Sequence, residues 1–187
     1  MGILNVFNNI TVDGYFSGVD GDFNWAHTGS HDPEWDSYVA ANAGGGGTLL
    51  LGRMTYEIMA GYWPSPAAAA NNPVVAERIN KMNKVVVSKT LDSAIWSNTT
   101  ILKGDLVDAV KILKVTVEPG MTILGSGSLV AQLTEAGLID QYSFVVNPLV
   151  LGAGRTLFGG IAGRTNLKLT SSRAFENGNV LLVYSPA

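Results

Sequence analysis

TLLLGRMTYE, residues 48–57, joins a short apolar run to a polar segment through one glycine. The first four residues have the length and composition of a buried strand, and a short helix is expected from Arg53 to about Met59. A strand that turns through Gly52 into a helix aims unpaired N–H groups and the positive end of the helix dipole at one place. That geometry suits an anion such as a phosphate, and Arg53 adds bidentate reach. A structural turn with a solvated Arg53 is the alternative interpretation.

The composition is that of a lightly charged chain with a large core. The 187 residues, 47% apolar and 14% charged, fit one domain, 1–187. The net charge of −3, without a basic cluster, argues against nucleic acid as a partner but allows a small phosphorylated molecule. Without cysteine there are no disulfides or thiolate metal sites. No signal peptide and no membrane span of ~18 apolar residues is recognisable, so we expect a cytoplasmic protein that does not bind membranes.

Strand and helix patterns alternate along the chain. A further Gly-rich junction, Gly125-Ser126-Gly127-Ser128, follows the apolar run 121–124 and precedes a helix that ends at Gly137. It allows backbone to approach a ligand closely but lacks the full dinucleotide fingerprint. The sequence Glu176-Asn177-Gly178 predicts a hairpin between the last two strands. These patterns predict an α/β fold, with a mostly parallel mixed sheet flanked by helices and an antiparallel C-terminal hairpin. Further expected strands cover 3–11, 84–87, 100–102 and 142–150, the last of them broken at Asn147-Pro148. Expected helices cover 32–43, 74–83 and 105–114, and 61–73 is expected to be irregular.

The segment before the first expected helix has the features of a functional lid. Phe16 to Ser30 is an irregular stretch of ~15 residues carrying three aromatic side chains, which is more typical of a lid than of a connector. Asp32 and Pro33 are good N-cap and first-turn residues for the helix. Asp36, beside Trp35, is either a first-turn acid favoured by the helix dipole or a carboxylate that points into a cavity. His27 and His31 are interpreted as exposed loop residues, and two histidines without further ligands predict no metal site.

Taken together in order, these pieces resemble the dihydrofolate reductase superfamily. Within it, the chain is similar to small stand-alone relatives of the C-terminal reductase domain of the bifunctional riboflavin-biosynthesis deaminase-reductase (the RibD C-terminal domain). The spacing from Asp36 to Arg53 is that of the pterin-binding acid and an arginine in dihydrofolate reductases. The other matching pieces are 11–15 (TVDGY), 52–57 (GRMTYE), 88–91 (SKTL), 125–127 (GSG), 137–140 (GLID) and 148–154 (PLVLGAG).

The resemblance implies NADPH as the cofactor. Arg53 and Lys89 are the implied partners of the 2′-phosphate, and Asp36 is implied to face the substrate ring and assist its protonation. An enclosed carboxylate can take a raised pKa that suits such work. Other residues implied at the cofactor are Asn9, Asp13, Gly14, Gly52, Thr55, Ser88, Gly125, Ser126, Gly127 and Ser128; those implied at the substrate or lid are Tyr15, Trp25, Trp35 and Asp36.

The implied activity is reduction of a small heterocycle, of pteridine or dihydrofolate type or resembling 5-amino-6-(5-phosphoribosylamino)uracil, by hydride transfer in a homodimer. Two departures limit the transfer of a riboflavin role: GRMTYE differs from the turn of the riboflavin reductases, and the cysteine-free chain has no zinc deaminase half. The alternative is a catalytically silent nucleotide- or antifolate-binding protein that keeps the fold, because fold does not guarantee chemistry.

Overall fold

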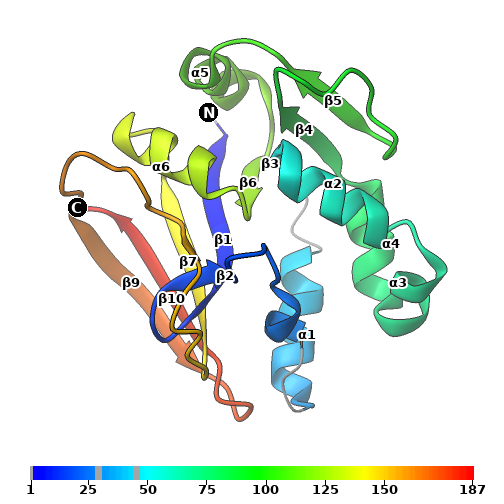
Figure 1. Ribbon diagram of the computed structural model, residues 1–187, viewed down its shortest axis with the longest axis vertical. Coiled ribbons are helices and arrows are strands. Elements are labelled where there is room, and N and C mark those ends of the chain that lie inside the picture. The colour runs from blue at the N-terminus through cyan, green and yellow to red at the C-terminus, as the bar shows by residue number, and fades with distance from the viewer. Residues whose placement is uncertain (1, 28–30, 44–46) are drawn as a thin grey trace.

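The computed structural model describes residues 2–27, 31–43 and 47–187. Its strands are β1 (Ile3–Thr11), β2 (Tyr15–Ser17), β3 (Thr48–Gly52), β4 (Asn83–Val87), β5 (Thr99–Leu102), β6 (Gly120–Leu124), β7 (Gln141–Asn147), β8 (Arg155–Thr156), β9 (Leu167–Ala174) and β10 (Val180–Pro186). Its helices are α1 (Pro33–Ala43), α2 (Arg53–Tyr62), α3 (Pro66–Asn71), α4 (Pro73–Lys81), α5 (Leu106–Thr116) and α6 (Gly127–Glu135), with a 3₁₀ turn η1 (Asn24–His27). Figure 1 shows the helices packed around one twisted sheet.

An eight-stranded sheet in the order β5-β4-β3-β6-β1-β7-β10-β9 forms the centre of the molecule. The six strands from β5 to β7 run parallel to one another. Strand β10 is antiparallel to both of its neighbours, β7 and β9. The mostly parallel mixed sheet and its antiparallel C-terminal hairpin are therefore confirmed. A separate antiparallel pair, β2 and β8, lies beside it.

Both faces of the sheet are covered, which explains why β3 is apolar throughout. Leu50 belongs to the core beneath α5 and α6, whereas Leu49 and Leu51 pack with α2 and α4 on the opposite face. On β1, Val6 shares the first of these faces, and Phe7 packs on the second with α1. A strand that alternates between two buried faces reads as a continuous apolar run.

Local sequence signals fix several helix starts. The carboxylate of Asp32 accepts the N–H groups of Glu34 and Trp35 (2.9 and 3.1 Å), as expected for the N-cap of α1. Asp105 accepts the N–H of Asp108 (3.0 Å) and caps α5 in the same way. No helix within 2–27, 31–43 and 47–187 is long and apolar enough to cross a membrane.

Two expectations about local structure were wrong. The segment 61–73 contains α3, because Ser65 caps the helix and Pro66 occupies its first turn, where a missing N–H is harmless. The expected lid loop 16–30 contains β2 and η1, and its residues 28–30 lie outside the described part of the chain. The expected break at Asn147-Pro148 is confirmed, since β7 ends at Asn147, but the strand does not resume over 148–150.

Candidate cofactor and substrate site

The sheet order brings the predicted cofactor residues into one row. Strands β4, β3, β6 and β1 are neighbours and parallel, so their carboxyl ends lie at one edge of the sheet. At these carboxyl ends, Ser88 and Lys89 lie after β4, and Gly52 to Thr55 lie where β3 meets α2. Gly125 to Ser128 lie after β6. Asn9 lies near the end of β1, which the turn Asp13-Gly14 follows. Ligands of open α/β sheets bind outside the carboxyl ends of the strands. The predicted cofactor residues therefore lie at the carboxyl ends of the strands, where open α/β sheets bind their ligands.

The two strand–Gly–helix junctions touch one another. The Ser126 hydroxyl accepts the N–H of Gly52 (2.7 Å) and donates to Thr55 Oγ1 (3.0 Å). A Cβ placed on Gly125 would lie 2.9 Å from Thr55 Oγ1, and one on Gly52 would lie 3.0 Å from Ser126 Oγ. We call Gly52, Thr55, Gly125 and Ser126 the junction clasp. Both glycines are needed there for close approach.

The helices that begin at these junctions carry no side-chain caps. Neither Gly52 before α2 nor Ser126 before α6 makes a side-chain hydrogen bond to its helix. In the first turn of α6 the Ser126 carbonyl accepts the N–H of Leu129 (2.9 Å), which leaves the N–H groups of Gly127 and Ser128 as the candidate donors to a ligand. With the dipole of each helix, they form a surface suited to a phosphate or pyrophosphate.

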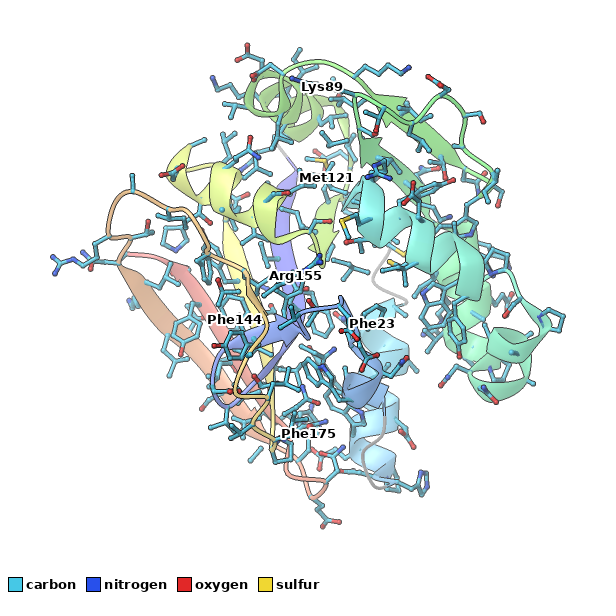
Figure 2. The ribbon with its side chains drawn as sticks, in the orientation of Figure 1. Phe23, Lys89, Met121, Phe144, Arg155 and Phe175 are labelled. Atoms are coloured by element: carbon cyan, nitrogen blue, oxygen red, sulfur yellow. The ribbon has the colours of Figure 1, made fainter. Side chains whose placement is uncertain are left out.

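The basic residues predicted to bind the 2′-phosphate lie on neighbouring strand ends. Arg53 is half exposed and its Nη1 contacts both oxygens of Glu57, at 3.0 and 3.1 Å. Lys89 is exposed at the tip of β4 (Figure 2). The buried hydroxyl of Ser88 accepts the N–H groups of Thr90 and Leu91, so this side chain shapes the turn that carries Lys89.

Asn8 was not predicted as a site residue. Its Oδ1 accepts the N–H of Gly125 (2.7 Å), and its buried Nδ2 has no hydrogen-bond partner in the described part of the chain. An unpaired buried amide is costly and calls for a functional or structural reason. In the sequence, Asn8 interrupts an apolar strand, and that interruption was the one available signal. Its neighbour Asn9 accepts a hydrogen bond from Asn147 Nδ2 (3.1 Å).

Asp13 organises the turn between β1 and β2. Its carboxylate accepts the Thr11 hydroxyl (2.6 Å) and the N–H groups of Leu151 and Gly152 (3.2 and 2.7 Å). The Thr11 hydrogen bond, with those from the backbone, holds the pKa of Asp13 below its usual value. Gly14 follows with φ of 85°, as the turn requires. Asp13 therefore ties this turn to the loop after β7.

A cleft of about 350 Å³ separates the segment before η1 from helix α2. Its lining includes Ile58, which is exposed on α2, and Phe23; the other lining residues are Asp20, Gly21, Asp22 and Asn24. Arg155 on β8 reaches the same segment, where its Nη2 donates to the Val19 carbonyl at 3.4 Å (Figure 2). The cleft combines aromatic and aliphatic walls with polar groups, as small-molecule sites do.

The RibD C-terminal domain matches residues 3–181, nearly the whole chain. The chain belongs to the RibD C-terminal domain family. A relative at 26% identity over 175 residues is the uncharacterized protein YyaP of Bacillus subtilis (strain 168), and the match covers 94% of this chain and 90% of that protein.

Solved structures share the fold of this RibD C-terminal domain protein. A protein from Shewanella sp. PV-4, provisionally assigned to riboflavin biosynthesis, superposes with a TM-score of 0.79 at 20% identity over 99% of both chains. A pyrimidine reductase-like protein of Corynebacterium diphtheriae gives 0.69 at 15% identity, covering 100% of this chain and 92% of that one. The deaminase/5-amino-6-(5-phosphoribosylamino)uracil reductase of Thermotoga maritima gives 0.69 at 13%, and this chain spans 57% of it. The fold is thus of the reductase type.

The expectation of an enclosed Asp36 was wrong for this RibD C-terminal domain protein. The Asp36 side chain is 55% exposed, and its Oδ2 lies 2.8 Å from Nδ1 of the exposed His31. Trp35 and Tyr38 form the face of α1 that packs on the sheet, so the intervening position turns toward solvent. The first-turn interpretation of Asp36 is the one that agrees with this geometry.

Three aromatic residues predicted at the substrate do not line the cleft. Trp35 packs edge-on against Phe175, with ring centroids 5.1 Å apart, and contributes to the core. Tyr15 and Trp25 are half-buried. A Cβ on Gly154 would lie 3.0 Å from Tyr15 Cγ, so Tyr15 packs against the loop before β8.

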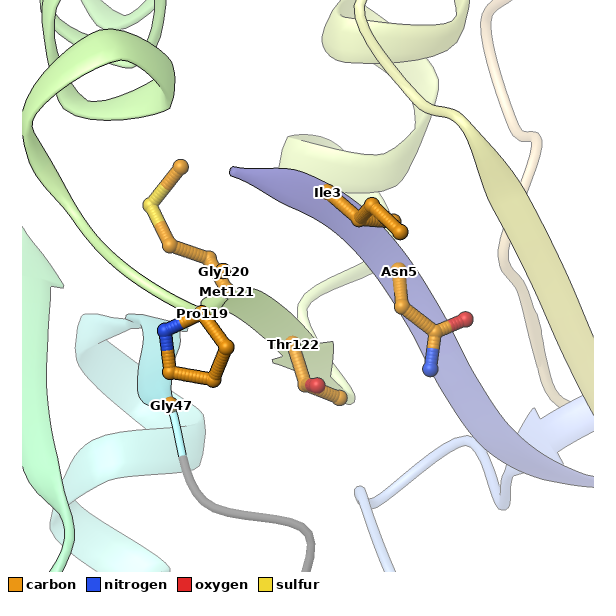
Figure 3. Close-up of a pocket in the computed structure, with 7 residues that line it drawn as sticks. All are labelled: Ile3, Asn5, Gly47, Pro119, Gly120, Met121 and Thr122. Atoms are coloured by element: carbon orange, nitrogen blue, oxygen red, sulfur yellow. The ribbon is translucent and has the colours of Figure 1, made fainter. Parts of the chain in front are cut away.

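A second pocket, of about 150 Å³, lies at the opposite edge of the sheet. Figure 3 shows its lining residues at the amino ends of β1 and β6. None of the predicted site residues lines it; its lining consists of Ile3, Asn5, Gly47, Pro119, Gly120, Met121 and Thr122. We therefore assign the candidate site to the carboxyl edge.

Proposed function

We propose that this protein is an NADPH-dependent reductase of a small heterocyclic substrate. The observation that carries the proposal is the pair of uncapped helix starts, α2 and α6, held side by side by the junction clasp. Two adjacent helix N-termini suit a pyrophosphate better than a single phosphate. The reductase-type fold of the family supports the same proposal.

The residues present fit NADPH. The first turn of α6 would hold the pyrophosphate, and Arg53 and Lys89 would hold the 2′-phosphate on the neighbouring strand ends. Asn8 Nδ2, a buried donor without a partner beside Gly125, is the kind of group that a bound cofactor completes. When bound, NADPH supplies the hydride, and the protein supplies binding, orientation and exclusion of water.

The substrate would enter the cleft between Phe23 and Ile58. A flat ring of pteridine or aminouracil type fits a cleft with an aromatic wall and polar residues at its rim. The segment 20–24 would then act as the lid, excluding water when the cleft is filled. The role of Asp36 as proton source rests on the family resemblance alone, because its carboxylate is exposed, pairs with His31 and does not line this cleft.

Thermal stabilisation by NADPH, compared with NADH and NADP⁺, tests the proposal. A ligand at ~100 times its Kd adds about 2.7 kcal/mol to the free energy of unfolding, or roughly 5–10 °C in Tm for a chain of this size. We expect a shift with NADPH that clearly exceeds the shift with NADH, followed by NADPH oxidation with a pteridine or an aminouracil. No shift with any dinucleotide would contradict the proposal.

The exposure of Asp36 favours a second candidate, a silent nucleotide-binding protein. A proton donor already paired with His31 on the surface is less suited to catalysis than an enclosed one. This candidate predicts NADPH binding without oxidation across the substrate panel. Replacing Asp36 by Asn separates the two: a slower reaction with unchanged NADPH affinity supports the reductase and the role of Asp36.

We further propose that the protein is a homodimer. The outer strand of the sheet, β9, is exposed along almost its whole length, and its free edge can pair with another strand. An antiparallel pairing of two β9 strands would cover both edges. Light scattering is expected to give twice the mass of the chain; a monomer at all concentrations would contradict this assembly.

A further inference from the structure

The strain at Ser126 points to a role for this residue beyond contact with a cofactor. Ser126 has φ 59° and ψ 58°, a left-handed conformation that residues with a Cβ adopt rarely and at a cost. Only one other non-glycine residue in the described part of the chain has a positive φ, Asn98, with φ 57°. Asn98 lies between β4 and β5 at the opposite edge of the sheet, where its carbonyl accepts the N–H of Lys84.

The Ser126 hydroxyl is fully engaged within the protein. It accepts the Gly52 N–H at 2.7 Å and donates to Thr55 Oγ1 at 3.0 Å. Its single proton is thus directed at Thr55 and not at a ligand. A contact of Ser126 with the predicted cofactor would therefore involve its backbone and not its hydroxyl proton.

The three groups form a relay that ends at a free donor. Gly52 N–H donates to Ser126, Ser126 O–H donates to Thr55, and the Thr55 proton has no acceptor among the side-chain hydrogen bonds of the described residues. Hydrogen bonds in a chain polarise one another, so the Thr55 hydroxyl becomes a stronger donor. The bond from Ser126 also restricts its orientation. Thr55 is in the first turn of α2, facing the start of α6.

We propose that Ser126 is a positioning residue for an anionic ligand: it joins the starts of α2 and α6 and orients the Thr55 hydroxyl toward a pyrophosphate held between them. The left-handed backbone at Ser126 places its Oγ between Gly52 and Thr55, and the two hydrogen bonds offset the strain. This inference rests on the proposed NADPH site, but it assigns Thr55 as the side-chain donor and Ser126 as its support.

Four variants separate the hydroxyl from the backbone strain. Ser126→Ala removes the relay and keeps the strain, whereas Ser126→Gly removes both. Thr55→Val removes the final donor with little change in shape, and Thr55→Ser keeps it. Asn98→Gly is the matched control, because it relieves the same strain far from the ligand. The measurements are Tm, the Kd of NADPH, and amide hydrogen exchange at Gly52.

Both Ser126 variants and Thr55→Val are expected to weaken NADPH about tenfold, the loss of one well-placed hydrogen bond to a charged group. Thr55→Ser should stay within about twofold of the wild type. Ser126→Gly should melt higher than Ser126→Ala and still bind as weakly. Gly52 exchange should be faster in both Ser126 variants and unchanged in Asn98→Gly. A Ser126→Gly variant that binds NADPH like the wild type would overturn the inference.

Inorganic pyrophosphate, used as a second probe, keeps the two proposals apart. If wild type is stabilised by pyrophosphate but not by NADPH, the proposed cofactor is wrong, and the Ser126 variants are judged by their loss of the pyrophosphate shift. If wild type binds NADPH and the Ser126 variants bind it equally well, the reductase proposal stands and the positioning role falls. Wild type that binds neither probe overturns both.

Discussion

The helices of this protein begin in two different ways. Helices α1, α3 and α5 start beneath a side-chain oxygen, from Asp32, Ser65 and Asp105, which accepts the free N–H groups of the first turn. Helices α2 and α6, at the centre of the sheet, start without one. The fourth helix, α4, also lacks such a bond but begins with Pro73, which removes one donor. Three outer helix starts are thus capped by side chains, whereas the two central ones are not, and these central starts are where we propose that a ligand binds.

The largest expected effect comes from closing the central junctions sterically. Gly125→Ala would add a Cβ 2.9 Å from Thr55 Oγ1 at a residue with φ of 57°. Overpacking and left-handed strain together should lower the free energy of unfolding by about 2–5 kcal/mol and abolish NADPH binding. Urea denaturation and NADPH titration measure the two effects. Gly137→Ala is the control: its φ is 64°, but no atom lies within 4 Å of the added Cβ, so it should cost about 1–2 kcal/mol and leave binding intact.

The C-terminus of α4 is completed by a buried side chain, in contrast to the uncapped N-termini of α2 and α6. Lys84 is buried, and its Nζ donates to the carbonyls of Asn80, Met82 and Ser97 at 3.0, 2.7 and 3.2 Å, closing the C-terminus of α4. Its Nζ also lies 4.3 Å from the centroid of the Trp96 ring. Burial lowers the pKa of Lys84 to about 8.

A lowered lysine pKa makes folding release a proton between the folded and unfolded values. Stability should therefore rise with pH from about 8 to about 10.4, by up to about 3 kcal/mol, and Lys84 should add no pH dependence below about 8, where both states bind the proton. Urea midpoints measured across this range test the prediction. Lys84→Met, which keeps the buried stem, should flatten the pH dependence; an unchanged rise in this variant would assign it to other groups.

The Arg53→Ala variant tests whether Arg53 binds the 2′-phosphate of NADPH. Arg53→Ala should weaken NADPH about 10- to 100-fold, the range for hydrogen bonds to a charged group, and NADH by much less. Isothermal titration with both dinucleotides measures the ratio. Arg78→Ala, a substitution of an exposed arginine on α4, provides the control and should change neither affinity. Equal losses for NADPH and NADH would remove the 2′-phosphate assignment.

The smallest effects are expected from two substitutions, one that removes the side-chain cap of α5 and one that adds an acid to the first turn of α6. Asp105→Ala removes a peripheral cap and should cost about 1 kcal/mol without altering NADPH binding. Ser128→Asp places an acid in the first turn of α6, which should stabilise the free protein by about 0.3–1 kcal/mol and weaken NADPH, because the carboxylate occupies the anion position. Tm and NADPH titration measure both changes. Ser128→Asn, without the charge, is the control, and tighter binding in Ser128→Asp would contradict the comparison.

The sequence carried the information for the sheet and for the row of strand ends, because these depend on short-range patterns. The apolar run before Gly52 and the Asn177-Gly178 turn each specify local backbone directly. Helix α3 was not predicted because the prolines at 64, 66 and 73 were interpreted as helix-breaking residues. Pro66 after the cap Ser65 is instead a typical helix start.

The details of the site depend on contacts between distant segments and were not predictable. Ser126 shows no sequence signal for a left-handed backbone, and its contact with Gly52 spans 74 positions. Asn8 looked like an interruption of a strand until β6 placed Gly125 beside it. The side of α1 on which Asp36 lies follows from the packing of Trp35 and Tyr38 on the sheet, which local periodicity left open.

The junction clasp also has a consequence for evolution and for protein engineering. Because a Cβ on Gly52 would meet Ser126 and one on Gly125 would meet Thr55, a larger residue at either glycine requires a smaller side chain opposite it, and homologues are expected to show each pair co-varying. Arg53 and Lys89 lie outside this contact, on exposed side chains. If the proposed NADPH site is correct, the preference between NADPH and NADH can be changed at Arg53 and Lys89 without altering the four clasp residues.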